Sequence, residues 1–135
     1  MRLSLLLVCT MAAACASRPA PSEHKGRSIL VTDSLLDAGG TDTVRFGRLR
    51  SGEIAVLQLW LENGAARPVA VASYDRICGC TTLEYDSRPI APGAARRVSL
   101  SFDSRGQWGW QLKTLDISFA GGRRPLRLFV EAEVE

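Results

Sequence analysis

The sequence predicts an all-β fold, a single sandwich of two packed antiparallel sheets, and three observations predict it. Apolar and polar residues alternate with a period of two along most of the chain after residue 27, as in strands that bury one face. No window of about a dozen residues has the i, i+3, i+4, i+7 spacing of an amphipathic helix. Turn-forming residues such as Asn63-Gly64 and Pro92-Gly93 separate the alternating runs.

The alternating runs predict about seven to eight short strands. The clearest run is 53–63, where Ala55, Leu57, Leu59 and Leu61 share one face, and we expect it to be central in its sheet. The expected strands cover 28–31, 43–46, 53–63, 69–74, 82–85, 97–102, 111–119 and 126–134. Short strands with turn signals at this spacing are typical of an immunoglobulin-like sandwich, although the Cys…Trp…Cys frame of antibody domains is absent.

One sandwich accounts for the whole region 28–135, because about 108 residues suffice for a single two-layer core. Leu35 and Leu36, just before Gly39-Gly40, indicate either a turn of helix or a bulge, and the pattern leaves both open.

A secretory leader precedes this domain. Arg2 is followed by an apolar run over 3–11 and by small residues at 12–14, which predicts a signal peptide over 1–14 that is too short to span a bilayer. Cys15 directly after three alanines resembles a bacterial lipobox, in which that cysteine is lipidated and becomes the first mature residue. The alternative is cleavage by ordinary signal peptidase, which leaves Cys15 unmodified and the protein soluble in the periplasm or secreted.

Residues 15–27 are then expected to be the lipidated cysteine and a flexible tether, since this stretch has two prolines and no apolar periodicity. More than one acyl chain gives a stable anchor. Ala16 stands where an aspartate favours retention in the inner membrane, so the resemblance implies an outer-membrane lipoprotein that faces the periplasm.

Charge and histidine content argue against two classes of function. The net charge is +3, and removal of Arg2 with the leader lowers it to +2. Arginines occur singly or in pairs, without the basic run that tracks a phosphate backbone, so nucleic acid is not expected as a partner. The sole histidine, His24, lies in the tether, which argues against Ser-His-Asp or Cys-His catalysis. We therefore expect no enzyme activity and identify no small-molecule substrate.

The order of several short motifs resembles a known family. The motifs are Phe46-Gly47-Arg48-Leu49, Asn63-Gly64, Cys78-Gly79-Cys80-Thr81, Pro92-Gly93 and Phe102-Asp103. Together they resemble the bacterial domain-of-unknown-function family fifteen-seventy-three from about residue 43 to 134. The resemblance implies an immunoglobulin-type sandwich of the abnormal-spindle and Hydin class, found in lipoproteins or periplasmic proteins, and it brings no assigned reaction.

Cys78 and Cys80 are the only thiols after Cys15, and three fates are open to them. The first fate is a disulfide that staples the end of the sandwich. A disulfide requires Cα atoms within about 6.8 Å, which is close to the span of an extended chain over these positions, so we expect Gly79 to bend the chain. Such a bridge is expected to be strained and therefore labile. Redox exchange with a partner is the second fate, with Arg76 close enough in sequence to favour a thiolate. Zinc lacks ligands, but copper(I) is compatible with two soft thiolates, so copper is the one cofactor left open.

Trp108 and Trp110 share one parity, which predicts that both rings lie on the same face, beside Arg105. They either pack within the strands and loops or form an aromatic surface that binds a partner protein or a glycan. The preferred function is a non-enzymatic accessory module that binds another envelope protein through strand edges or this surface. The alternative is a thiol-redox or copper(I)-handling protein that uses Cys78 and Cys80.

Overall fold

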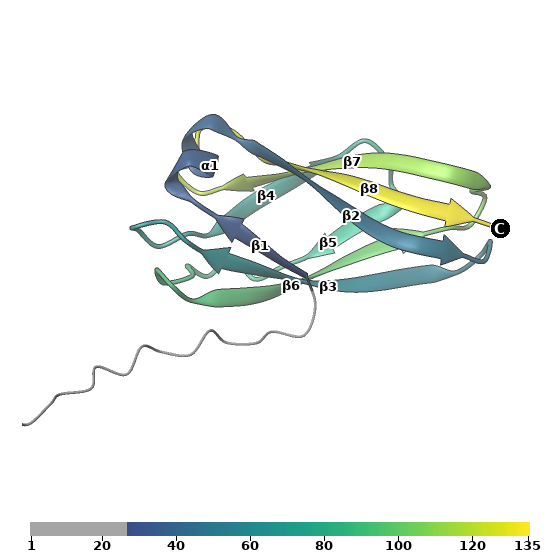
Figure 1. Ribbon diagram of the computed structural model, residues 1–135, viewed down its shortest axis with the longest axis horizontal. Helices are drawn as coiled ribbons and strands as arrows, with labels where there is room; N and C mark the ends of the chain where they lie inside the picture. Colours follow the sequence, from purple (N-terminus) through teal and green to yellow (C-terminus); the bar gives the residue numbers. More distant parts are fainter. Residues whose placement is uncertain (1–26) are drawn as a thin grey trace, which may run out of the picture.

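The computed structural model describes residues 27–135, which form two four-stranded sheets packed face to face and one short helix (Figure 1). The elements are β1 Arg27–Val31, α1 Asp33–Ala38, β2 Gly40–Leu49, β3 Ile54–Asn63, β4 Val71–Arg76, β5 Thr81–Glu84, β6 Ala95–Asp103, β7 Gly109–Phe119 and β8 Leu126–Val134. One sheet has the strand order β1-β3-β6-β5 and the other β2-β8-β7-β4. The predicted all-β sandwich is confirmed, and β3 is central as expected.

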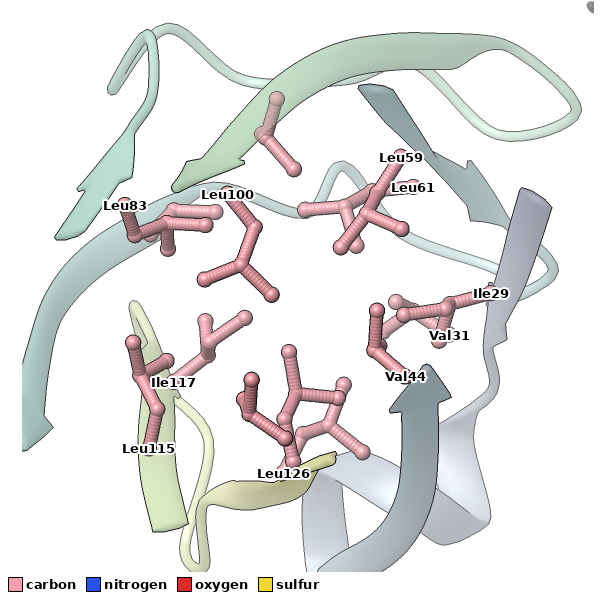
Figure 2. Packing of buried hydrophobic residues seen from close by; sticks show 14 of the residues in the cluster. Ile29, Val31, Val44, Leu59, Leu61, Leu83, Leu100, Leu115, Ile117 and Leu126 are labelled. Atoms are coloured by element: carbon pink, nitrogen blue, oxygen red, sulfur yellow. The ribbon is translucent and has the colours of Figure 1, made fainter. Parts of the chain in front are cut away.

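The core lies between the sheets and is built by the period-two alternation. Leu59 and Leu61 of β3 and Leu100 of β6 point toward Leu115 and Ile117 of β7 (Figure 2). All five are at most 1% exposed. Burying a side chain of this size contributes about 1.5–3 kcal/mol, so the alternation in the sequence fixes which face of each strand turns inward.

Two strand pairs are parallel, so the expectation of an entirely antiparallel sandwich is wrong at these positions. β1 runs parallel to β3, and β2 runs parallel to β8. Both β1 and β2 are edge strands, and the chain passes from one sheet to the other between them through α1. Each therefore pairs with a strand distant in sequence rather than with a hairpin neighbour, and parallel pairing needs such a crossover.

The Leu35–Leu36 segment forms a short helix rather than a bulge. Thr32 caps its start by accepting a hydrogen bond from the Leu35 N–H at 3.1 Å. Gly39, with φ +78°, ends it and donates its own N–H to the Leu35 carbonyl. Leu36 is 2% exposed and joins the core, so α1 closes one end of the sandwich.

The opposite end of the sandwich, where the chain finishes, gathers the β2–β3, β4–β5 and β6–β7 connections (Figure 1). Ser104, which is fully buried, bonds through its Oγ to the carbonyls of Arg50 and Glu53 at 2.8 and 2.7 Å. Ser51 donates its N–H to the Glu135 carbonyl. These bonds fix the connections against one another, and we call this region the C-terminal end.

The predicted signal peptide, the predicted lipidation site Cys15 and most of the predicted tether lie outside the described residues. β1 begins at Arg27, one residue before the predicted start of the domain. Among residues 27–135, no helix is long and apolar enough to cross a membrane.

Candidate functional site

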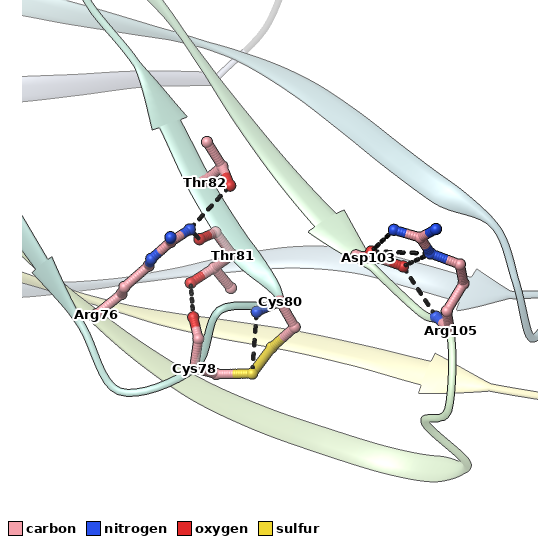
Figure 3. The surroundings of a disulfide bond; sticks show 7 residues. All are labelled: Arg76, Cys78, Cys80, Thr81, Thr82, Asp103 and Arg105. Carbon is pink, nitrogen blue, oxygen red and sulfur yellow. Dashed lines mark hydrogen bonds and ion pairs between the residues drawn. A yellow bond between two sulfur atoms is a disulfide. The ribbon is translucent and has the colours of Figure 1, made fainter.

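Cys78 and Cys80 form a disulfide in the β4–β5 connection at the C-terminal end (Figure 3). Their Cα atoms are 5.1 Å apart, within the usual range of about 4.4–6.8 Å. Both residues are half-buried. Of the three fates that the sequence leaves open, the structure therefore has the disulfide.

Hydrogen bonds hold this turn independently of the sulfur–sulfur bond. The Cys78 carbonyl accepts from the N–H and the hydroxyl of Thr81, each at 3.4 Å. The Cys80 carbonyl accepts from the Asp103 N–H at 2.8 Å, which ties the turn to the end of β6. The Cys80 N–H in turn donates to Cys78 Sγ at 3.1 Å (Figure 3). One sulfur thus has a backbone donor whose position the neighbouring strands fix.

The chain bends at Gly79 as expected, since the Cα atoms of the two cysteines are 5.1 Å apart. The φ of Gly79 is not in the left-handed region, and a Cβ added there meets no atom within 4 Å. The bend at this position therefore does not require a glycine, because any small residue fits the same backbone.

Arg76 reaches from the end of β4 to the start of β5. Its Nη1 donates to the Thr81 carbonyl at 2.5 Å and to Thr82 Oγ1 at 3.0 Å. These bonds link the two sheets beside the disulfide (Figure 3). The guanidinium is therefore engaged by oxygen atoms of β5, and its charge lies next to the turn.

The metal-binding alternative concerns Cys78 and Cys80. Within residues 27–135, no group of three or more His, Cys, Asp or Glu side chains is placed to hold an ion. Copper(I) requires thiolates, whereas the two sulfur atoms here are bonded to each other. His24 lies outside the described residues.

Trp108 and Trp110 are 68% and 62% exposed, so neither ring packs in the core. Only Trp110 lies in β7, where alternation sets the face of the side chain. Trp108 precedes the strand, and Gly109 between them has φ +74°. On the outward face of β7, Trp110 is followed by Leu112, which is 40% exposed. Leu112 was not among the predicted site residues, although it shares its parity with Trp110.

Ile77 extends this set of exposed apolar side chains. It follows directly after β4, is 74% exposed, and donates its N–H to the Thr114 carbonyl of β7 at 3.4 Å. Sequence reasoning missed it, because its exposure depends on where β4 ends. We call Ile77, Trp108, Trp110 and Leu112 the apolar surface.

A shallow cavity of about 220 Å³ adjoins Trp110. A bulge in β2 between Arg45 and Arg48 shapes it, with Gly47 at φ +75°. Arg45 Nε bonds Glu131 Oε2 at 2.9 Å on its rim. Its lining consists of Arg45, Gly47, Arg48, Trp110, Glu131, Ala132 and Glu133. Charged groups of both signs therefore border the ring of Trp110.

Arg105 is held by Asp103 within the β6–β7 turn. Its Nε lies 2.9 and 3.0 Å from the two carboxylate oxygens, and its Nη2 lies 2.5 Å from Oδ2. Hydrogen bonds from the Arg105 side chain, and then from its backbone N–H, lower the pKa of Asp103 to about 2. This pairing orders the turn before Trp108, and the predicted role of Arg105 beside the tryptophans stays a prediction.

One edge of β7 is open along the apolar surface. β4 pairs with β7 only over residues Leu115 to Phe119 of β7. The hydrogen bond from the Ile77 N–H to the Thr114 carbonyl is the last one toward the start of β7. For the rest of β7, from Gly109 to Lys113, the described chain supplies no backbone partner on this side. Because strand residues alternate in the side to which they bond, Leu112 and Trp110 direct their N–H and C=O groups to the same side as Thr114.

Comparison with protein families gives a match over residues 39–134 to the family described as "Protein of unknown function (DUF1573)". The chain belongs to this family. The resemblance seen in the motif order is thereby confirmed at the level of the family. No curated protein matches the DUF1573 chain.

Solved structures show the fold of this DUF1573 domain. A protein of unknown function from Porphyromonas gingivalis W83 is 22% identical, with 67% of this chain and 43% of that chain covered and a TM-score of 0.58. The ASH/PapD-like domain 7 of human CEP192 is 14% identical, with 98% of both chains covered and a TM-score of 0.54. The Vibrio cholerae VesB protease is 13% identical over 67% of this chain and 30% of that chain, with a TM-score of 0.54.

At these identities the likeness concerns the fold alone, an immunoglobulin-like sandwich. The chain matches less than half of the length of the Porphyromonas protein and less than a third of VesB. The protease in the VesB name therefore carries no activity over to this domain.

Proposed function

We propose that this DUF1573 chain is a non-enzymatic, envelope-anchored binding module that holds an extended segment of another envelope protein along the open edge of β7. One observation carries the proposal: exposed Trp110 and Leu112 stand beside unpaired backbone groups of the same strand. Backbone pairing supplies affinity in such strand addition, and side chains at alternate positions supply specificity.

The occupant that fits is a β-strand with apolar side chains at alternate positions. It would continue the line of β4, extending the existing β4–β7 pairing beyond Thr114. Its outward apolar side chains would lie against Leu112 and Trp110, and Ile77 would mark the end where β4 gives way to the partner. Exposed apolar clusters of this kind typically mark protein interaction sites, and tryptophan is enriched among the residues that dominate binding energy.

Two proline substitutions test the edge. Leu112→Pro removes an N–H directed to the open side, and its ring obstructs an incoming strand. Lys113→Pro, the matched control, removes an N–H directed to β8, where Lys113 pairs with Val130. We expect Leu112→Pro to retain the melting temperature within a few degrees and lose the partner, whereas Lys113→Pro lowers the melting temperature.

The partner is first identified by photo-crosslinking in cells from a photoreactive residue that replaces Leu112. A photoreactive residue in place of Ser99, on the outer face of the other sheet, is the control. We expect one protein to crosslink from 112 and not from 99. With that protein purified, Trp110→Ala should weaken binding by about thirtyfold, the value for a 2 kcal/mol hot spot. Equal crosslinking from both positions, or an unchanged affinity for Leu112→Pro, would contradict the proposal.

Anchoring forms the second part of the proposal. Residues 15–26 can span at most about 40 Å, so a lipid on Cys15 would keep the sandwich close to the membrane and its partners there. Mass spectrometry of the membrane fraction tests it: a diacylglyceryl-modified, N-acylated Cys15 supports an outer-membrane lipoprotein facing the periplasm. An unmodified Cys15 rules out the anchor and leaves a periplasmic or secreted module.

A further inference from the structure

We propose that the Cys78–Cys80 bridge is a thiol–disulfide exchange site. The mixed disulfide forms on Cys78, while Cys80 leaves when the bridge opens and attacks Cys78 when the bridge re-forms. The reacting partner is a dithiol of another envelope protein. The inference depends on the geometry of the turn and is independent of the strand-binding proposal.

The two sulfur atoms differ in their surroundings. Cys80 packs against the hydrophobic core, whereas Cys78 is not among the described side chains that do so. The neighbours of Cys78 on either side, Ile77 and Gly79, are exposed. The backbone of Cys80 is tied to β6 through the Asp103 N–H. An incoming thiol therefore approaches Cys78, and Cys80 stays behind it.

A fixed donor favours Cys78 as the thiolate once the bridge is open. The Cys80 N–H lies 3.1 Å from Cys78 Sγ, and a hydrogen bond to a charged form stabilises that form. Bonds from Thr81 and Asp103 to the turn carbonyls do not involve sulfur, so the donor keeps its place after reduction. Backbone donors of this kind make a cysteine more reactive in exchange.

The exchange balances in two steps. A partner thiolate gives an electron pair to Cys78 Sγ, the bond to Cys80 breaks, and its electron pair leaves on Cys80, which takes a proton from water. The partner's second thiolate then attacks the partner's first sulfur, which is bonded to Cys78 in the mixed disulfide. A disulfide forms within the partner, and Cys78 is released as a thiolate. The bridge is thereby reduced to two thiols, and the partner dithiol is oxidised to a disulfide; the reverse sequence reoxidises the bridge.

Single-cysteine variants assign the two roles. Full-length Cys80→Ser and Cys78→Ser chains are mixed with oxidised glutathione, quenched in acid and mapped by peptide mass spectrometry, which separates positions 78 and 80 from Cys9 and Cys15. We expect the adduct at Cys78 in Cys80→Ser to form about tenfold faster than the adduct at Cys80 in Cys78→Ser. The pH at half-maximal rate should also be lower for Cys78, which a merely structural cysteine would not show.

Wild-type protein provides the second measurement, which does not depend on the folding of the variants. After brief reduction by excess dithiothreitol, a limiting amount of iodoacetamide should alkylate Cys78 before Cys80, and removal of the reductant in air should restore the bridge. Equal rates at the two positions, faster reaction at Cys80, or a bridge that resists excess dithiothreitol in the folded protein would overturn the proposal.

Discussion

Removal of the disulfide should cost the domain little stability. The bridge closes a loop of three residues, Cys78 to Cys80. In the chain-entropy relation, closing such a loop lowers the entropy of the unfolded chain and so raises the free energy of unfolding by about 1.6 kcal/mol at 25 °C. The bonds from Thr81 and Asp103 remain in the reduced form, so we expect no further loss from collapse of the turn. The Cys78→Ser, Cys80→Ser double variant should therefore be less stable by about 1.5 kcal/mol.

Urea unfolding followed by circular dichroism measures this loss. With a slope of about 1.5 kcal/mol/M, the midpoint should fall by about 1 M while the slope stays constant. Wild-type protein held in dithiothreitol is the matched control, because it keeps both cysteine side chains, and its midpoint should agree with that of the double variant. A loss above about 3 kcal/mol, or failure to fold at 37 °C, would refute the reasoning and make the bridge a structural staple.

Three further predictions test the surrounding structure. Asn63 is 2% exposed, and its side chain bonds to the Arg67 and Ile90 carbonyls and to the Ala65 N–H, each at 2.8 Å. Asn63→Ala should therefore lower the free energy of unfolding, measured in urea, by about 3 kcal/mol. A decrease of less than about 1 kcal/mol would contradict this prediction. The pKa of Asp103 is about 2 in the folded protein against its ordinary value of 3.8, so its contribution to stability is full above about pH 5 and is lost as the pH falls toward 2. Asp103→Asn should therefore melt at a lower temperature than wild type at neutral pH, and the difference should shrink toward about pH 2. A difference in melting temperature that stays constant across this range would count against it. Gly79→Ala should change the melting temperature by less than about 2 °C, because its backbone is unstrained and the space is open.

The alternation of apolar residues determined most of the fold in advance. In β8, Leu128 and Val130 are fully buried while Arg127 is exposed, as a period of two requires. The same pattern cannot identify a strand's neighbour, because a strand that buries one face does so equally beside a parallel or an antiparallel partner. The parallel pairing of β1 with β3, and of β2 with β8, was therefore not predictable from the sequence.

The candidate site was harder to predict, because it depends on where strands end. Trp110 was singled out by its parity and is exposed on the outward face of β7, one of the two alternatives that the sequence left open. Trp108 falls outside β7, and its place is set by Gly109. Ile77 is exposed because β4 stops at Arg76 while β7 continues. The spacing of Cys78 and Cys80 allowed a bridge without requiring one. These features follow from tertiary pairing lengths, which local patterns do not encode.

The apolar surface and the disulfide adjoin each other through Ile77, which connects β4 to Cys78. A strand added along β7 beyond Thr114 would therefore run past the β4–β5 turn and could bring a partner thiol to Cys78 at high effective concentration. If both proposals hold, Trp110→Ala should slow exchange with the partner protein far more than exchange with glutathione, because only the former depends on docking. If Trp110→Ala slows exchange with the partner and with glutathione equally, the substitution disturbs the turn itself. If exchange with the partner is not slowed, the apolar surface and the disulfide act separately.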